Sequence, residues 1–126
     1  MKPQLAPLPD APFVNDAGTI TNLVHNAPPG TISYIECNPN TTRSRHRHLD
    51  GHWLFVVEGL MLYYERPADS KEDVPPLYVG PGEMVWTPGD ADHKCYFPRH
   101  TKLISVSTAT RTHEEHEKRL TRVEWP

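Results

Sequence analysis

One stretch of the chain carries most of the information about its fold, RSRHRHLDGHWLFVVEG at residues 43–59. Arg43–His48 alternates as a half-buried strand does, so its two histidines, two positions apart, are predicted to share one face. The Asp50-Gly51 pair signals a tight turn, and His52–Glu58 is predicted to be the next strand. Because the turn reverses the chain, the histidine that opens this strand is expected to lie beside the first two.

Further strand signals lie on both sides of this stretch. The predicted strands are Ile20–His25, Thr31–Cys37, Leu60–Glu65, Leu77–Val79, Glu83–Thr87, His93–Phe97 and Lys102–Thr108. The chain has 7 glycines and 14 prolines, which argues against a helical bundle and for short strands joined by tight turns. Roughly nine short strands with regular turns predict an all-β sandwich or barrel.

The length of 126 residues fits a single domain with three parts. Residues 1–13 hold four prolines and are expected to form an extended arm, either frayed or lying on a neighbouring subunit. Residues 14–109 are predicted to form the barrel. Residues 110–126 are predicted to be a short helix and tail, since Thr112 and Glu115 form a capping box.

Composition excludes several classes of protein. The net charge is −3, from 13 basic and 16 acidic residues, and no basic block stands out, so no nucleic-acid partner is expected. No apolar run reaches the ~18 residues that a membrane span needs, and no signal peptide is recognisable, so we expect a cytoplasmic protein without a membrane partner. In a reducing cytoplasm, Cys37 and Cys95 are expected to be buried thiols.

A fourth histidine completes a candidate metal site. His93 follows the predicted turn at Pro88–Asp92 and opens another strand. Converging imidazoles of His46, His48, His52 and His93 would suit one divalent ion per chain. Zinc is favoured among the candidates, and iron, nickel, copper, cobalt and manganese stay open.

The other histidines are expected to be ordinary surface or hydrogen-bonded residues: His25, His100, His113 and His116. The last two lie three positions apart on the predicted helix among glutamates, where a solvated charged face is favoured over a metal site. For Arg43–His48, a basic surface strand is the alternative interpretation.

The histidine spacing resembles that of a known family. The pattern HxHx3Hx6G at residues 46–59 is similar to the first motif of the cupins, in which most members have Glu where His52 stands. The pattern Gx5Px4H at residues 82–93 is similar to the second cupin motif. The resemblance extends over about residues 31–108. It implies a double-stranded β-helix, or jelly-roll barrel, with a metal centre.

The chain departs from the family pattern at four positions. Asn40 and Asp90 replace glycines, Phe97 replaces an asparagine and His52 replaces the glutamate. Asn tolerates the left-handed backbone that glycine would adopt at position 40. The change at position 52 removes the one carboxylate from the ligand set, so a divalent ion would keep its +2 charge and favour an anionic ligand such as an enolate, phenolate or carboxylate.

Strand alternation predicts a substrate pocket with an apolar wall. Residues on the same face as the histidines, together with side chains expected at the mouth, are Ser44, Leu54, Val56, Tyr34, Met61, Tyr63, Trp86, Cys95 and Phe97. We expect Cys95 to act as a small buried hydrophobe. Trp53, Phe55 and Val57 have the opposite parity and are expected to pack on the second sheet or on a partner subunit. With the proline arm, they predict a homodimer.

The resemblance implies an enzyme. Small cupins with four histidine ligands include polyketide cyclases, in which the metal would act as a Lewis acid on a poly-β-ketone and stabilise the enolate of an aldol cyclisation or aromatisation. A neighbouring base or metal-bound hydroxide would take the proton, and no residue is assigned that role. The alternatives are a metal-dependent dioxygenase cleaving a β-diketone or flavonol-like enol, and a non-catalytic cupin that binds a small molecule.

Overall fold

The computed structural model describes residues 8–27, 30–48, 50–109 and 120–125, and within them the chain is all-β. One antiparallel sheet has six strands in the order β1-β2-β3-β10-β5-β8. These are β1 Phe13–Asn15, β2 Gly18–Ala27, β3 Gly30–Cys37, β10 Thr101–Ser107, β5 His52–Glu58 and β8 Met84–Thr87. The other sheet has five, in the order β11-β4-β9-β6-β7. These are β11 Leu120–Arg122, β4 Thr41–His48, β9 Ala91–Phe97, β6 Met61–Pro67 and β7 Leu77–Val79.

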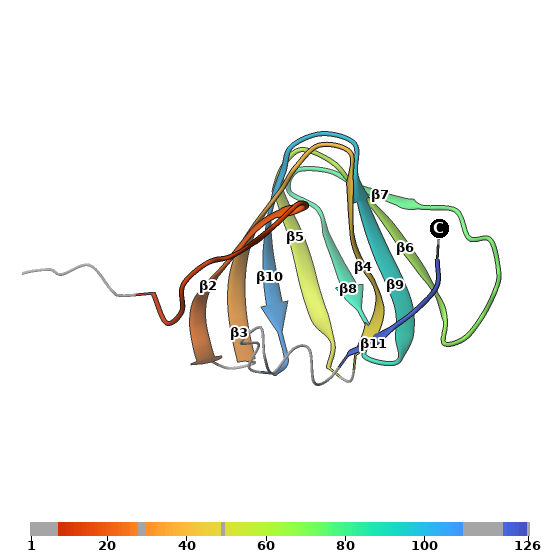
Figure 1. Ribbon diagram of the computed structural model, residues 1–126, viewed down its shortest axis with the longest axis horizontal. Coiled ribbons are helices and arrows are strands. Elements are labelled where there is room, and N and C mark those ends of the chain that lie inside the picture. Colours follow the sequence, from red (N-terminus) through yellow and green to blue (C-terminus); the bar gives the residue numbers. More distant parts are fainter. Residues whose placement is uncertain (1–7, 28–29, 49, 110–119, 126) are drawn as a thin grey trace, which may run out of the picture.

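The winding of the chain between the sheets makes the fold a jelly-roll barrel, as predicted (Figure 1). From β3 to β10 the chain passes from one sheet to the other at every connection except β6 to β7. Only β1 with β2, β2 with β3, and β6 with β7 pair with a neighbour along the chain in the described residues, and the other connections cross between the sheets. Strands distant in sequence therefore become neighbours in space.

The nine predicted strands are present with small shifts at their ends, and two short strands were not predicted. Phe13, which was assigned to the arm, begins β1, and Leu120, assigned to the end of the C-terminal helix, begins β11. Both strands are stabilised by pairing at a sheet edge. A sequence pattern of three residues does not reveal such pairing. The rest of the predicted helix falls within 110–119, outside the described residues. The described part contains no helix long and apolar enough to cross a membrane.

Two positions in the predicted turns have the required backbone. Asn40 has a φ of 57°, the left-handed conformation expected where the family has glycine. Gly59, the last residue of the first motif, has a φ of 97°, and a Cβ there would lie 2.5 Å from the His100 carbonyl oxygen. Both turns therefore close tightly.

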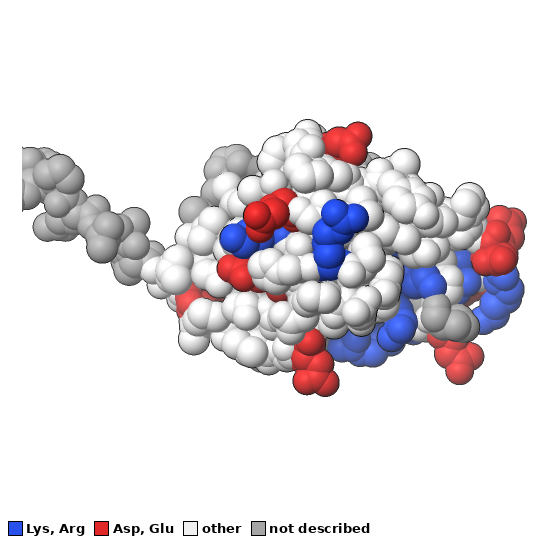
Figure 2. Space-filling view, turned by 90° about the horizontal axis from the view of Figure 1, so that it is seen from above, with Lys and Arg blue, Asp and Glu red and all other residues white. Residues whose placement is uncertain are grey.

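The core lies between the sheets. Its buried side chains come from both inner faces and are mostly apolar: Cys37, Leu54, Val56, Met61, Tyr63, Val79, Cys95, Phe97 and Leu103. Burial of this set from water is the main stabilising contribution to the barrel. Outside, charges are mixed, since Figure 2 shows basic and acidic side chains in small groups on a largely uncharged face.

The outer face of the five-stranded sheet carries a cluster of ion pairs. Arg47 of β4 donates from Nε to Asp92 of β9 and from Nη2 to Asp69, both at 2.8 Å. Asp92 is only 1% exposed and has Arg66 at 4.0 Å as a second cationic neighbour. Trp125 lies over the Arg66 guanidinium at 4.0 Å and covers one side of the cluster.

Candidate metal and substrate site

Three of the four predicted ligands lie together in the structure, each on a different strand. His46 of β4 lies directly opposite His93 of β9, and His52 opens β5. Their exposed fractions are 7%, 0% and 4%, respectively. The ring of His93 is 4.9 Å from that of His46 and 5.7 Å from that of His52, centroid to centroid. We call His46, His52 and His93 the histidine cluster.

The spacing of these rings suits a shared metal ion. Two imidazoles bound to one zinc at adjacent corners of a tetrahedron have ring centroids roughly 5 Å apart, given a Zn–N bond of about 2.1 Å. The observed 4.9 and 5.7 Å are close to that separation. Among the described side chains, however, no three His, Cys, Asp or Glu residues are arranged to hold a metal by themselves. The side chain of His48 is outside the described residues, so the four-histidine ligand set stays a prediction.

A cavity of about 510 Å³ opens beside the cluster, and His46 and His52 form part of its wall. That volume is in the range of sites that bind small molecules. Five of the predicted pocket residues line it: Ser44, Leu54, Met61, Cys95 and Phe97. Leu103 and Ile35, which were not predicted, also belong to its apolar wall.

Four other predicted pocket residues do not line this cavity: Tyr34, Val56, Tyr63 and Trp86. Ile35 faces the cavity, so Tyr34 beside it on β3 faces the other side of the sheet. Val56 and Tyr63 are fully or almost fully buried in the core. Trp86 is 42% exposed and packs on Trp53 at 4.4 Å. The parity of Tyr34, Tyr63 and Trp86 could not be fixed from the sequence, because no neighbouring histidine anchored it.

Strand β4 contains a bulge that the sequence did not reveal. Arg43 lies opposite Cys95 and His46 opposite His93, so three steps along β4 match two steps along β9. Ser44 and Arg45 adopt positive φ angles of 86° and 37° to accommodate the extra residue. Residues directly opposite each other point to the same face, so both Arg43 and His46 point inward. Uniform alternation would have sent Arg43 outward, and the segment contains no glycine to signal the bulge.

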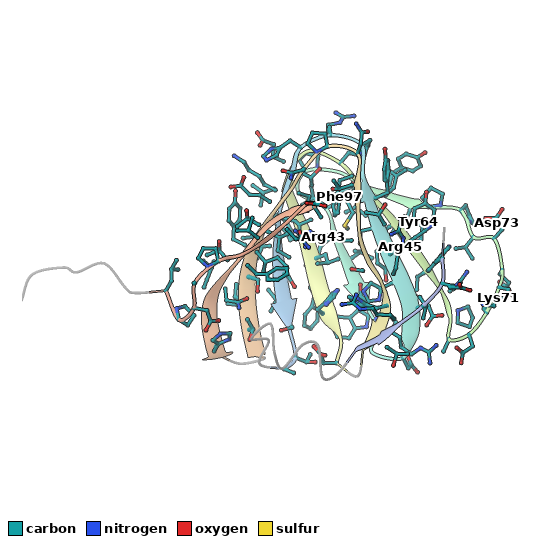
Figure 3. All side chains as sticks on the ribbon, viewed as in Figure 1. Arg43, Arg45, Tyr64, Lys71, Asp73 and Phe97 are labelled. Atoms are coloured by element: carbon teal, nitrogen blue, oxygen red, sulfur yellow. The ribbon has the colours of Figure 1, made fainter. Side chains whose placement is uncertain are left out.

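The cavity is positive. Arg43, Arg45 and Arg122 line it, and no described Asp or Glu does. Arg43 and Phe97, which both line the cavity, lie close to each other in the view of Figure 3. The two thiols add no negative charge, because burial raises the pKa of Cys37 to about 11 and raises that of Cys95 further. A local excess of basic groups in a chain of net charge −3 favours an anionic ligand.

Both cysteines are free and buried, as predicted. Of the histidines assigned ordinary roles, His25 hydrogen-bonds to Asp10 and Thr31, and His100 lies 3.3 Å from Glu36 at the surface. His113 and His116 are outside the described residues.

Comparison with known proteins gives structural matches only. No protein-family pattern matches the sequence, and no curated protein matches it. Among solved structures, the capsular polysaccharide assembling protein CapF of Staphylococcus aureus superposes with a TM-score of 0.79 at 20% identity over 96% of this chain. This chain spans only 33% of CapF.

Two further neighbours are nearer in size. KdgF from Halomonas sp. gives a TM-score of 0.66 at 14% identity, with 82% of this chain and 87% of KdgF covered. The CENP-C cupin domain of Drosophila melanogaster gives 0.63 at 12% identity, with 77% and 74% covered. Identities this low establish a common fold and leave the activity open. By its strand order, its winding and these neighbours, the chain has the cupin fold.

Proposed function

We propose that this protein is a metal-dependent cupin enzyme that acts on a small, anionic, enolisable substrate. The observation that carries the proposal is the histidine cluster, in which three buried imidazoles from three strands lie beside a cavity of about 510 Å³. Neutral imidazoles at this ring spacing are donors that one divalent ion could share.

The ligands in this proposal are His46, His48, His52 and His93. All four are neutral donors suited to zinc and to the other borderline divalent ions. The bound ion would supply Lewis acidity, which stabilises the oxygen of an enolate. A set without a carboxylate leaves the full charge of the ion available for that purpose.

The remaining residues of the cavity would bind and shield the substrate. Leu54, Met61, Phe97 and Leu103 form a wall that limits access of water to the reacting atoms. The arginines at the cavity would favour an anion over a neutral molecule. No described acidic side chain lines the cavity to serve as a general base, so the proton acceptor stays unassigned.

Among reactions that need an enolate, we favour an aldol cyclisation or aromatisation of the polyketide cyclase type. It needs Lewis acidity, a dry pocket and positive charge, and it needs no redox cofactor. One CapF structure is a complex with the inhibitor 3-isopropenyl-tropolone. Tropolone is itself an enolised hydroxyketone, which supports this class of ligand by analogy of fold. Dioxygenase cleavage of a β-diketone or flavonol-like enol is the alternative.

Elemental analysis of natively purified protein, combined with an oxygen electrode, tests the proposal. About one zinc ion per chain and no oxygen uptake with a β-diketone would support the cyclase assignment. Iron, nickel or copper together with oxygen uptake would favour the dioxygenase. Protein that binds no divalent ion, even after incubation with each candidate, would contradict the proposal and favour a non-catalytic binding cupin.

A further inference from the structure

The bulge in β4 has a consequence for substrate binding, because it turns an arginine into the cavity. Ser44 and Arg45 both have left-handed backbone angles, at 86° and 37°. Such conformations are unfavourable in residues other than glycine, and they are concentrated at functional sites. Without the extra residue, Arg43 and His46 would point to opposite faces of the strand. With it, both face the same cavity.

The guanidinium of Arg43 is not neutralised by the protein. Its Nε and Nη2 atoms are buried and have no hydrogen-bond partner, and no ion pair in the described part of the chain includes Arg43. The Cys37 thiol interacts with the Arg43 side chain, but burial raises the pKa of this thiol to about 11, so it stays uncharged at neutral pH and supplies no counter-charge. Burying a charged group without a counter-charge is unfavourable, which indicates that the counter-charge comes from a ligand.

The two free donors also fit a particular ligand geometry. Nε and Nη2 are adjacent nitrogens at one edge of the planar guanidinium, and this edge matches the two oxygens of a carboxylate. We propose that Arg43 binds the carboxylate of the substrate and thereby selects for an enolisable keto acid.

The position of Arg43 sets where that carboxylate lies relative to the histidine cluster. Arg43 is opposite Cys95, two residues along β9 from His93, which is roughly 6–7 Å along the strand. A small molecule could therefore place a carboxylate at Arg43 and its enolisable oxygens at the cluster. This inference rests on the proposed function, because it takes the cluster as the reacting end of the cavity.

Two matched probes test the assignment. 2,4-Dioxopentanoate and 2,4-pentanedione share the β-diketone, and only the first has a carboxylate. Titration calorimetry on the metal-loaded protein would give the dissociation constant of each probe for the wild type, Arg43→Met, Arg43→Lys and the control Arg99→Met. Arg99 is exposed and does not line the cavity.

Arg43→Met should weaken the binding of 2,4-dioxopentanoate about ten- to a hundred-fold, the range for a hydrogen-bonded charged pair. It should leave the affinity for 2,4-pentanedione unchanged. Arg43→Lys keeps the charge without the planar edge, so it should lose only part of that affinity. Arg99→Met should match the wild type. An equal loss of affinity for both probes, or no loss of affinity for either, would overturn the proposal.

A metal-free measurement separates this proposal from the proposed function. In protein treated with chelator, 2,4-dioxopentanoate should raise the melting temperature of the wild type and not of Arg43→Met. Without probe, Arg43→Met should melt at or above the wild-type temperature, because an unpaired buried charge has been removed. A strongly lowered melting temperature would show a structural role and overturn the assignment. If the protein binds no metal but these shifts appear, Arg43 still binds carboxylates and only the proposed function fails.

Discussion

Two arginines of one strand, Arg47 and Arg43, have opposite environments. Arg47 faces outward, and its Nε and Nη2 atoms donate to two aspartates at 2.8 Å. Arg43 faces the cavity, and the same two atoms have no partner among the described residues. Arg47 on the outer face thus has acidic partners for both nitrogens, whereas Arg43 on the inner face has no described acidic partner.

This difference separates structural polar groups from groups available to a ligand. We call the ion pairs of Arg47, Asp69, Asp92 and Arg66 the outer cluster. In it, each buried charge has a counter-charge, and a fold tolerates ions away from water in this way. In the cavity, three arginines and two histidines line the wall without a described acidic residue. The outer residues should therefore govern stability, and the inner ones should govern binding.

The largest effect is expected at the histidine cluster. His93→Ala should reduce the metal content from about one ion per chain to nearly none, because His93 contacts both other rings of the cluster. His48→Ala should do the same if it supplies the fourth ligand. Elemental analysis measures the content, and His100→Ala, at an exposed histidine, is the control. Full metal content in His93→Ala with loss in His113→Ala would show that the ligands are elsewhere.

The outer cluster should show the reverse behaviour. Asp92→Ala leaves Arg47 and Arg66 without their buried counter-charge, so the melting temperature should fall by on the order of 10 °C. Metal content should not change, because Asp92 faces away from the cavity. Asp69→Ala is the matched control, since the Asp69 side chain is 85% exposed and its pair with Arg47 should contribute little. A loss of metal in Asp92→Ala would remove the distinction between the two faces.

Position 52 tests the role of charge in the cavity. His52→Glu should keep the metal, since imidazole nitrogen and carboxylate oxygen both bind these ions. The added carboxylate should lower the net charge of the site by one. Activity on an enolisable substrate should fall roughly tenfold or more, since about 1.4 kcal/mol of lost enolate stabilisation is a factor of ten. The pH–rate profile should move to higher pH, because a less positive site stabilises the deprotonated, anionic form of the reacting group less.

His52→Ala is the comparison, and it should weaken metal binding instead. An unchanged rate and pH profile in metal-loaded His52→Glu would mean that His52 serves geometry alone, and the Lewis-acid interpretation would lose its main support.

The outer face of the six-stranded sheet carries an exposed apolar patch on two of its strands. Phe55, Val57, Met84 and Trp86 on the paired strands β5 and β8 are 38%, 48%, 59% and 42% exposed. Apolar surface of this kind favours burial against a partner, and we expect a homodimer. Trp86→Glu should shift it toward monomer in sedimentation, whereas Leu77→Glu, on the other sheet, should not. A wild-type monomer at high concentration would contradict the expectation.

The smallest effect is expected near the N-terminus. The Asp10 carboxylate accepts a hydrogen bond from Asn22 at 3.0 Å and lies 2.5 Å from His25, and these contacts hold its pKa below the ordinary 3.8. Because the folded pKa is depressed, the stabilisation is present above pH 3.8 and is lost as the pH falls through the folded value. Asp10→Asn should lower the melting temperature by about 2–4 °C near neutral pH.

That difference should shrink in acid, where the wild-type carboxylate is protonated too. Thermal melts of both proteins across the acid range measure it, and Asp16→Asn, at an exposed aspartate, is the control. A difference independent of pH would mean that the carboxylate charge plays no part.

Much of the fold was predictable because local signals agree with the final topology. The nine strands, the turns at Asn40 and Gly59 and the buried thiols all follow from residue types that permit few alternatives. The edge strands β1 and β11 were not predictable, because three residues carry too little periodicity and pairing alone stabilises them.

The sequence by itself predicted the barrel, from strand alternation and turn positions, and the meeting of His46, His52 and His93, from a spacing that resembles the two cupin motifs. Only the tertiary structure decided which way Arg43 points, because that depends on the register of β4 against β9. A one-residue slip in register reverses the facing of every side chain beyond it. Register is set by packing across the barrel, and no local pattern in RSRHRH records it.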